Sequence, residues 1–152
     1  MVTITTEYFK LNDYERGYLS AVIDAEGCIG LYKHTRRNEY GKGYTWESIV
    51  VIDNTRTEIL EVIKEICRDE GTIGTVSAPH CLKGKCDYYR IPVEIQRIIL
   101  PQLHFAIKER QKDLLLEALI YLDIHKWSTR SPYEKRLLEI EKLLKEEKRN
   151  YV

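Results

Sequence analysis

The sequence contains no long hydrophobic run. Its longest stretch without a charged residue, residues 71–82, is 12 residues long and mostly polar, whereas a membrane-spanning helix needs about 20 apolar residues. The first residues also lack the basic start and apolar core of a secretory signal peptide. We therefore expect a soluble intracellular protein with no membrane partner.

The sequence also has no excess of charge of either sign, with 24 basic and 24 acidic residues. This balance argues against a uniformly basic nucleic-acid binder, but a sum conceals how the charges are distributed. Residues 33–42 hold four cationic residues against one acid, whereas residues 57–70 hold five acids against two cations. The first segment therefore predicts a basic face on an otherwise balanced protein.

Low-complexity segments and internal repeats are absent as well. With 43% hydrophobic and 32% charged residues, the composition is typical of a globular chain rather than a disordered or fibrous one. A length of 152 residues predicts a single domain over residues 1–152. The scarcity of methionine beside the high charge content favours a thermophilic source.

Only four cysteines are present, and in an intracellular chain cysteines are more often buried small side chains than disulfides. Cys28 and Cys67 lie among apolar neighbours and fit that description. Cys81 and Cys86 flank a predicted turn, so a disulfide between them stays open. Zinc is less favoured, because His80 is the only added ligand near them and a four-ligand set is missing.

Capping signals and hydrophobic periodicity predict an α-β-β-α-β-β-α order followed by C-terminal helices. The expected elements are a helix over 13–25, strands over 29–36 and 44–52, a helix from 55 to about 67, strands over 72–77 and 86–93, and helices over 95–100, 106–122 and 131–149. Two antiparallel hairpins in one sheet with helices on one face make an α+β domain. The other face of the sheet is left without helices.

Two acids close the first predicted helix. Asp24 and Glu26 lie near its C-terminus, where the helix dipole makes each carboxylate unfavourable by about 0.3–1 kcal/mol. A cation would remove this conflict, and a carboxylate beside a free backbone carbonyl offers the hard oxygen ligands of Mg²⁺ or Ca²⁺. An ordinary helix end with a solvated Glu26 and a left-handed C-terminal Gly27 is the alternative interpretation.

Short side chains line one face of the same helix. Gly17, Ala21 and Ala25 recur at a spacing of four residues, and Ser20 and Asp24 do so one step round. Such a face lets another backbone approach closely. We therefore expect it to pack against a partner helix.

Residues 19–27, LSAVIDAEG, resemble the signature of the LAGLIDADG homing endonucleases, with conservative departures at four of nine positions. The predicted order of elements is similar to that family over nearly the whole chain. The resemblance implies an αββαββα fold with a saddle-shaped antiparallel sheet and additional C-terminal helices. It also implies a metal-dependent, site-specific double-strand DNA endonuclease of the intron-homing type, which cuts a long pseudo-palindromic site and leaves 3′ overhangs.

The resemblance also implies a metal site. The last acid of the family's motif binds the catalytic ion and falls here on Glu26, with the carbonyl oxygen of Ala25 as a further ligand. Mg²⁺ is the expected ion, with Ca²⁺ or Mn²⁺ as substitutes, and no nucleotide cofactor is implied. Asp24 is expected to serve in helix-end hydrogen bonds.

Three further residues match active-site positions of the family. Lys108 and Gln111 correspond to a Lys-x-x-Gln segment and are expected on one helical face, although a helical lysine is more often a solvated surface residue. Asp53, beside Asn54 at the end of a strand, matches a polar position that contacts active-site waters. A turn or helix cap explains Asp53 and Asn54 equally well.

Because the motif occurs once, the resemblance implies a homodimer in which two motif helices pack around a two-fold axis. The interface residues implied are Gly17, Ser20, Ala21 and Asp24. Two copies of Glu26 would then be adjacent, and two like charges so close should not both stay ionised without a metal.

The uncovered face of the sheet is where the family binds double-stranded DNA. Alternation from Gly30 predicts base-facing side chains at Tyr32, His34, Arg36 and Asn38, with Tyr44, Trp46 and Ser48 opposite them. Lys33, Arg37 and Lys42 are expected to contact phosphates. Lys83, Lys85 and Arg90 are weaker candidates in the second hairpin, because cationic edge strands also guard against aggregation.

Two other function classes stay open on the same fold. One is an RNA-binding maturase that assists intron splicing, and the other is a DNA-binding regulator that does not cleave. A purely structural dimer would leave the paired acids at the helix end without an explanation.

Overall fold

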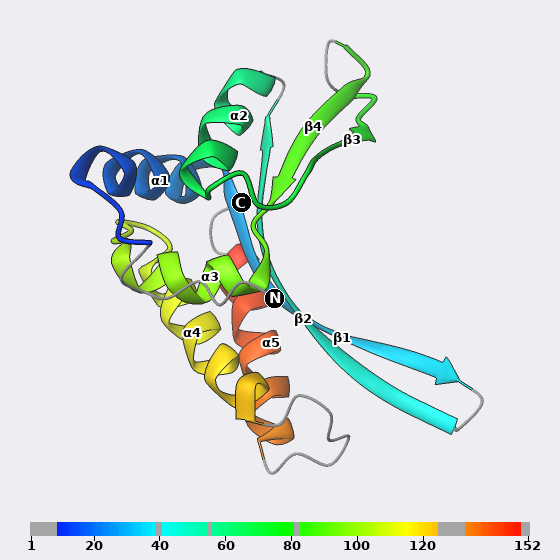
Figure 1. Cartoon of the computed structure of the whole chain (residues 1–152). Coiled ribbons are helices and arrows are strands. Elements are labelled where there is room, and N and C mark those ends of the chain that lie inside the picture. Colours follow the sequence, from blue (N-terminus) through cyan, green and yellow to red (C-terminus); the bar gives the residue numbers. More distant parts are fainter. Residues whose placement is uncertain (1–8, 39–40, 55, 81–82, 125–132, 150–152) are drawn as a thin grey trace. The chain divides into compact units, whose positions relative to one another are not determined.

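The computed structural model describes residues 9–38, 41–54, 56–80, 83–124 and 133–149. Figure 1 shows its elements, which are α1 (Asp13–Glu26), β1 (Gly27–Asn38), β2 (Gly41–Asn54), α2 (Thr57–Ile66), β3 (Ile73–Ser77), β4 (Lys85–Arg90), α3 (Val93–Ile99), the short 3₁₀ helix η1 (Leu100–Gln102), α4 (Glu109–Ile124) and α5 (Glu134–Arg149). The α+β class and the expected order of elements are confirmed. Among the described residues, no helix is both long and apolar enough to span a membrane.

The four strands form one sheet in the order β1-β2-β4-β3. β4 pairs antiparallel with both β2 and β3, so that Tyr89 lies opposite Ile52 on one side and Ile73 on the other. The chain divides into two compact units, residues 1–28 with 50–108 and residues 29–49 with 109–152. The single domain expected over residues 1–152 remains a prediction.

The first unit begins with a capping box on α1. The Asn12 side chain accepts a hydrogen bond from the Glu15 backbone N–H at 2.8 Å, and the Glu15 carboxylate accepts the Asn12 N–H at 3.0 Å. These bonds satisfy two of the donors that a helix N-terminus leaves open. The helices bury one face each, with Leu19 and Ile23 on α1, Leu60 and Ile63 on α2, and Ile95 and Ile99 on α3. The apolar periodicity of the sequence thus forms the core.

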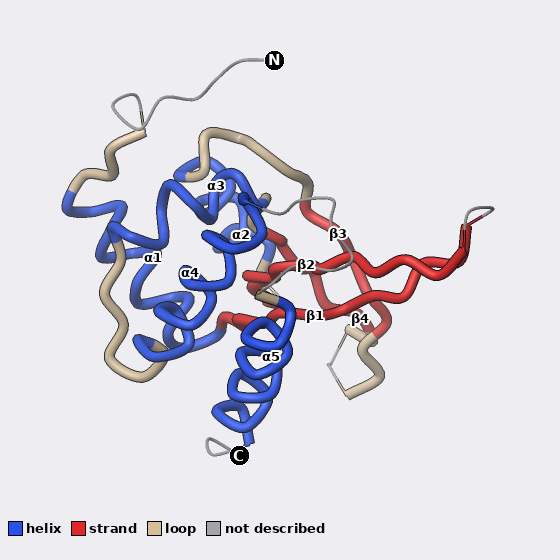
Figure 2. Tube along the Cα trace, turned by 90° about the horizontal axis from the view of Figure 1, so that it is seen from below, coloured by secondary structure: helices blue, strands red, loops and turns tan. Residues whose placement is uncertain are grey.

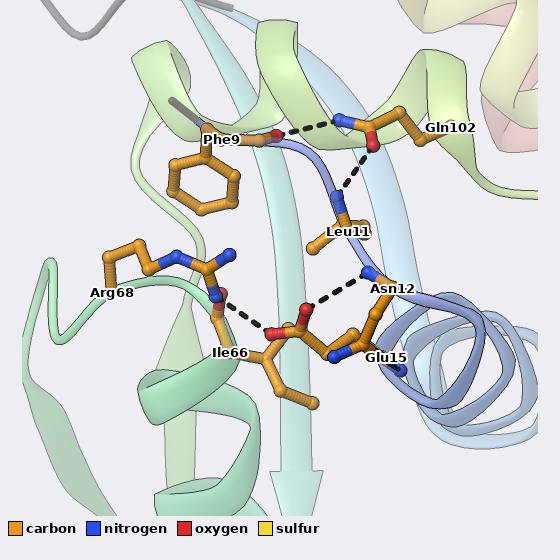
Figure 3. A network of polar contacts seen from close by, with 7 residues as sticks. All are labelled: Phe9, Leu11, Asn12, Glu15, Ile66, Arg68 and Gln102. Atoms are coloured by element: carbon orange, nitrogen blue, oxygen red, sulfur yellow. Dashed lines mark hydrogen bonds and ion pairs between the residues drawn. The ribbon is translucent and has the colours of Figure 1, made fainter. Parts of the chain in front are cut away.

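A polar network anchors the segment before α1 (Figure 3). The Gln102 amide accepts the Leu11 N–H at 2.9 Å and donates to the carbonyl oxygens of Phe9 and Ile98 at 3.1 and 2.9 Å. Arg68 donates to the Glu15 carboxylate at 2.7 Å and lies over the Phe9 ring at 4.6 Å. The network therefore ties the N-terminal segment to the ends of α2 and α3.

The second unit places α5 alongside β1, as Figure 2 shows. The Lys33 ammonium donates to Glu134 at 2.5 Å, and the Lys33 backbone N–H donates to the Glu141 carboxylate at 2.9 Å. Because β1 is an edge strand, the second bond satisfies an outward-facing backbone donor that an edge leaves open. Farther along α5, Lys148 donates to the Tyr32 hydroxyl at 3.0 Å.

Candidate active site and nucleic-acid interface

α1 passes into β1 without a loop. The alternative interpretation, an ordinary helix end, placed Gly27 in the left-handed conformation of a capping glycine, but its backbone is extended, with φ −79° and ψ 156°. A Cβ atom at Gly27 would lie 2.7 Å from the Ile23 carbonyl oxygen, so the glycine is required by close approach to the preceding turn. Glu26 is consequently the last residue of α1 and directly precedes the strand.

The Glu26 side chain is exposed, and within the described part of the first unit it contacts the Asn54 amide. The Asn54 amide donates to the Glu26 carboxylate at 2.5 Å, and the Asn54 side-chain oxygen accepts the Arg56 N–H at 2.8 Å. The second bond fixes the orientation of the amide, so that its NH₂ group is directed to Glu26. Asn54 at the end of β2 therefore holds the carboxylate of Glu26.

Asp53 lies on the opposite strand face from Asn54, because successive side chains of a strand alternate. It pairs with Tyr88 across the sheet and is exposed. Of the two polar residues at the end of β2, the structure thus brings Asn54, and not Asp53, to Glu26. The alternation counted from the buried Ile52 was the signal in the sequence that could have identified Asn54.

Asp24 turns toward the segment before α4. Its carboxylate accepts the backbone N–H groups of Ala106 at 2.8 Å, Ile107 at 3.0 Å and Lys108 at 2.9 Å. Three successive N–H groups directed at one anion form a nest, which offsets a negative charge by fixed dipoles. The expectation that Asp24 serves in hydrogen bonds at the helix end agrees with this geometry.

Lys108 lies in a bend just before α4, because α4 begins at Glu109 rather than near residue 106. The prediction that Lys108 and Gln111 share a helical face is therefore wrong. The Lys108 ammonium donates to the carbonyl oxygens of Ile23 at 3.1 Å and Asp24 at 2.5 Å. Burial lowers the pKa of Lys108, and the Asp24 charge partly offsets that effect. Gln111 is 2% exposed and belongs to the second unit.

These contacts reduce the unfavourable interaction between the helix dipole and the acidic residues at the end of α1. The nest balances Asp24, and the Lys108 ammonium lies on the carbonyl end of α1, where a cation is favourable. Only Glu26 still presents an exposed carboxylate at that end. Part of the conflict that suggested a metal ion is thus resolved by the chain itself.

The donor atoms that remain fit a hard cation in their chemistry. A carboxylate from Glu26 and a carbonyl oxygen from the exposed Ala25 are oxygen ligands of the kind that Mg²⁺ prefers. Within the described ranges, no group of three or more His, Cys, Asp or Glu side chains could hold a metal ion. Such a site would therefore need further ligands besides these described side chains.

The four residues implied for a dimer interface divide into two pairs. Gly17 and Ala21 are exposed, and apart from its chain neighbours and the backbone of its own helix no described atom lies within 4 Å of a Cβ placed on Gly17. Ser20 and Asp24 are engaged within the first unit, since the Ser20 hydroxyl accepts the His104 N–H at 3.3 Å. Tyr14, 67% exposed, extends the exposed strip one turn toward the helix start.

In the second unit, the side chains of β1 and β2 that share one face of the hairpin differ from those predicted. His34 contacts Glu47 at 2.7 Å, whereas the Lys33 ammonium lies 5.8 Å from the centre of the Trp46 ring. Alternation then puts Trp46 and Ser48 on the Lys33 side, away from His34. The prediction that Trp46 and Ser48 face the same way as Tyr32 and His34 is wrong.

Lys33 was expected to contact phosphate, but it forms an ion pair with Glu134 of α5. The remaining candidates of this hairpin, Arg36, Arg37, Asn38, Lys42 and Tyr44, have side chains outside the described part of the structure. Their proposed DNA contacts stay predictions. Glu47 is the residue of this face that the sequence argument missed.

In the second hairpin, β4 presents two different faces. Asp87 accepts hydrogen bonds from Thr57 of α2 and from Thr75, and these bonds lower its pKa. Lys85 shares the Asp87 face by alternation, whereas Tyr88 and Arg90 lie on the other. Lys83 precedes the strand and is exposed. Of the cationic candidates within β4, Arg90 is therefore the one on the face away from α2.

Tyr88 is a further residue of this face that the sequence argument missed. Its ring lies across Gly74 of β3, where a Cβ would come within 2.4 Å of the ring. Glycine at this position lets the ring lie flat along the sheet.

Comparisons with solved structures identify the fold. The archaeal intron-encoded homing endonuclease I-Vdi141I, solved in complex with DNA, matches with a TM-score of 0.70 and 22% identity over 89% of this chain and 84% of that one. The LAGLIDADG homing endonuclease I-GzeII, in complex with its DNA target, matches with a TM-score of 0.65 and 16% identity over 87% of this chain. The LAGLIDADG homing endonuclease I-SmaMI, bound to cleaved DNA, matches with a TM-score of 0.55 and 22% identity over 89% of this chain.

The chain spans 44% of I-GzeII and 43% of I-SmaMI, which is less than half of each. No protein-family model matches the chain, and no match was found among curated proteins. At these identities the likeness shows the fold, and the chain has the fold of the LAGLIDADG homing endonucleases.

Proposed function

We propose that the protein is a site-specific DNA endonuclease that cuts both strands of a long pseudo-palindromic site as a homodimer, requires a divalent metal such as Mg²⁺, and leaves 3′ overhangs. One observation carries the proposal: an exposed carboxylate, Glu26, is the last residue of α1, and the half-buried ammonium of Lys108 lies on carbonyl oxygens at the same end of that helix. The fold supports it, because the solved neighbours include homing endonucleases in complex with DNA.

The chemistry assigned to this chain is phosphodiester hydrolysis: a water oxygen bonds to phosphorus and loses a proton, the bond from phosphorus to one sugar oxygen breaks, and that leaving oxygen takes up a proton. Glu26, held by Asn54, and the Ala25 carbonyl oxygen would hold the metal ion. When bound, such an ion supplies activation of the water and stabilisation of the leaving oxygen. The Lys108 ammonium supplies positive charge in a partly desolvated site, where charge stabilisation is stronger than in water.

The homodimer is supported by Gly17. A glycine inside a helix costs about 1 kcal/mol relative to alanine, and no described atom explains why a side chain is missing there. An approaching helix from a second copy would supply that reason. Two copies of this chain would also approach the length of neighbours of which one copy covers 44% and 43%.

A DNA-contacting face is assigned in each unit separately: the face with His34 and Glu47 in the second unit, and the face with Tyr88 and Arg90 in the first. Tyr32 shares the His34 face by alternation, and its hydroxyl accepts a hydrogen bond from Lys148 of α5. Arg36, Arg37, Asn38, Lys42 and Tyr44 continue the first hairpin and are proposed as contacts to bases or phosphates.

The experiment is a selection of cleaved sites from a randomised duplex library, run in parallel with Mg²⁺ and with Ca²⁺. The parental protein should enrich one long site with Mg²⁺ and produce 3′ overhangs. Glu61→Gln, which makes a carboxylate-to-amide change on the exposed surface of α2, should behave like the parent. A folded protein that binds duplex DNA but cleaves no sequence would be a non-cleaving regulator, and preference for RNA would favour a maturase.

A further inference from the structure

Two sets of hydrogen bonds connect the segment before α4 to the end of α1 in opposite directions. In one, the Asp24 carboxylate accepts the N–H groups of Ala106, Ile107 and Lys108. In the other, the Lys108 ammonium donates back to the carbonyl oxygens of Ile23 and Asp24. Asp24 thus holds the backbone of Lys108 by its side chain and the ammonium of Lys108 by its own carbonyl group.

We infer that Asp24 is a positioning residue for Lys108, which fixes where the lysine ammonium lies at the end of the motif helix. The inference rests on the proposed nuclease function for its effect on cleavage, but not for its effect on Lys108 itself. The two acids of the motif then have separate tasks. Glu26 presents an exposed carboxylate, and Asp24 orients the Lys108 ammonium on the carbonyl end of α1.

The geometry favours this assignment over a simple helix cap. A lysine side chain has several rotatable bonds, so its ammonium is placed well only when its backbone is fixed. The Lys108 N–H is itself one of the three donors to Asp24, at 2.9 Å. These donors precede α4, so without Asp24 their N–H groups would lack the acceptor that now fixes the bend. The loss of Asp24 would therefore release the bend that carries Lys108.

The first test measures the reactivity of Lys108 toward an amine-acylating reagent, followed residue by residue by mass spectrometry. In the parental protein Lys108 is half-buried and bonded to two carbonyl oxygens, so it should react slowly. Asp24→Asn should raise its rate about tenfold, which is the scale of one lost hydrogen bond to a charged group. Lys64 is the internal control, because it is half-buried on α2 in the same unit and should keep its rate.

The matched control is again Glu61→Gln, which should leave the reactivity of Lys108 unchanged. An unchanged Lys108 rate in folded Asp24→Asn overturns the inference. An equal increase at Lys64 overturns it as well, because that result indicates general loosening. If Asp24→Asn does not fold, Asp24→Glu replaces it: the charge is kept, but the longer side chain cannot meet the three N–H groups in the same way, so Lys108 should again react faster.

The second test is a double-mutant cycle on single-turnover cleavage of the selected site. Lys108→Met should slow cleavage by about 100-fold or more, and Asp24→Asn by about 10- to 100-fold through displacement of the lysine. The double variant should be no slower than Lys108→Met alone, because Asp24 acts through Lys108. Additive losses would overturn the positioning role.

The two tests keep failure of the inference apart from failure of the proposed function. A parental protein that cleaves no duplex contradicts the nuclease proposal, while the acylation experiment still decides whether Asp24 positions Lys108. Conversely, an active nuclease with unchanged Lys108 reactivity in Asp24→Asn retains the function and rejects the inference.

Discussion

Acidic residues at the two ends of α1 lie in opposite electrostatic environments. At the N-terminus, Glu15 completes the capping box and pairs with Arg68, where a negative charge is favoured by the helix dipole. At the C-terminus, Glu26 is exposed where the same dipole opposes it. The first end is arranged for stability, whereas the second keeps a carboxylate that stability does not explain. A charge held against its local field is a reason to seek its use in binding or catalysis.

The largest expected effect is a loss of cleavage activity on substitution of Glu26, whereas substitution of Glu15 should lower stability instead. Glu26→Gln should lower cleavage by at least about 100-fold, because it removes an anionic ligand while keeping the shape. Its free energy of unfolding should stay equal or rise by a few tenths of a kcal/mol, since an unfavourable charge is lost. Glu15→Gln should do the reverse and lower stability by about 1 kcal/mol with cleavage retained. Cleavage at near the parental rate by Glu26→Gln would remove Glu26 from the active site.

The next effect concerns the network that anchors the N-terminal end. Gln102→Leu removes the partners of Phe9, Leu11 and Ile98 and should lower the free energy of unfolding by about 1–3 kcal/mol, because backbone groups lose their partners. Urea denaturation of the variant measures this loss. A stability equal to that of the parent would show that water replaces the Gln102 amide at no cost.

A smaller effect should appear in the pH dependence of stability. Burial alone would raise the pKa of Glu15, but the Asn12 N–H and Arg68 outweigh it and lower the pKa. A carboxyl with a depressed folded-state pKa stabilises the fold above its unfolded value, near 4.5, and this contribution is lost as the pH falls through the folded value. Parental stability should therefore decline below about pH 4.5, and Glu15→Gln should decline less steeply. Parallel curves for the two proteins would contradict the role of Glu15.

Features set by residues close together in the sequence could be predicted from it, whereas features set by long-range contacts could not. The capping box of α1 was predictable because Asn12 and Glu15 are three residues apart. The start of α4 was misplaced because Asp24, 84 residues before Lys108, binds the N–H groups there. Contacts of this range leave no local pattern in the sequence. The face on which Trp46 lies was missed because alternation within each strand does not fix the register between β1 and β2, and a slip of one residue exchanges the faces.

The same limit applies within the candidate site. The motif identified Glu26 and suggested Lys108, and the structure places both at the end of α1. The resemblance selected Asp53 at the end of β2, whereas the structure brings the adjacent Asn54 to Glu26. The motif could not show this, because it depends on which strand face meets the helix. Nor could the motif show that Gly27 is required by contact with Ile23 rather than by a left-handed backbone.

The smallest expected effect lies midway along α1, at Gly17, and it tests whether the exposed face between the two ends meets a partner. In an isolated chain, Gly17→Ala should raise the free energy of unfolding by up to about 1 kcal/mol, because alanine favours the helix and no described atom lies within 4 Å of its Cβ. In a dimer that packs on this face, the added methyl group should instead weaken association, and Ala21→Leu should weaken it further by overfilling the interface.

Sedimentation of both variants over a range of concentrations, beside urea denaturation of dilute protein, separates the effect on association from the effect on folding. A more stable Gly17→Ala protein with an undiminished dimer would place the subunit interface elsewhere, whereas opposite signs for folding and association would assign it to this face.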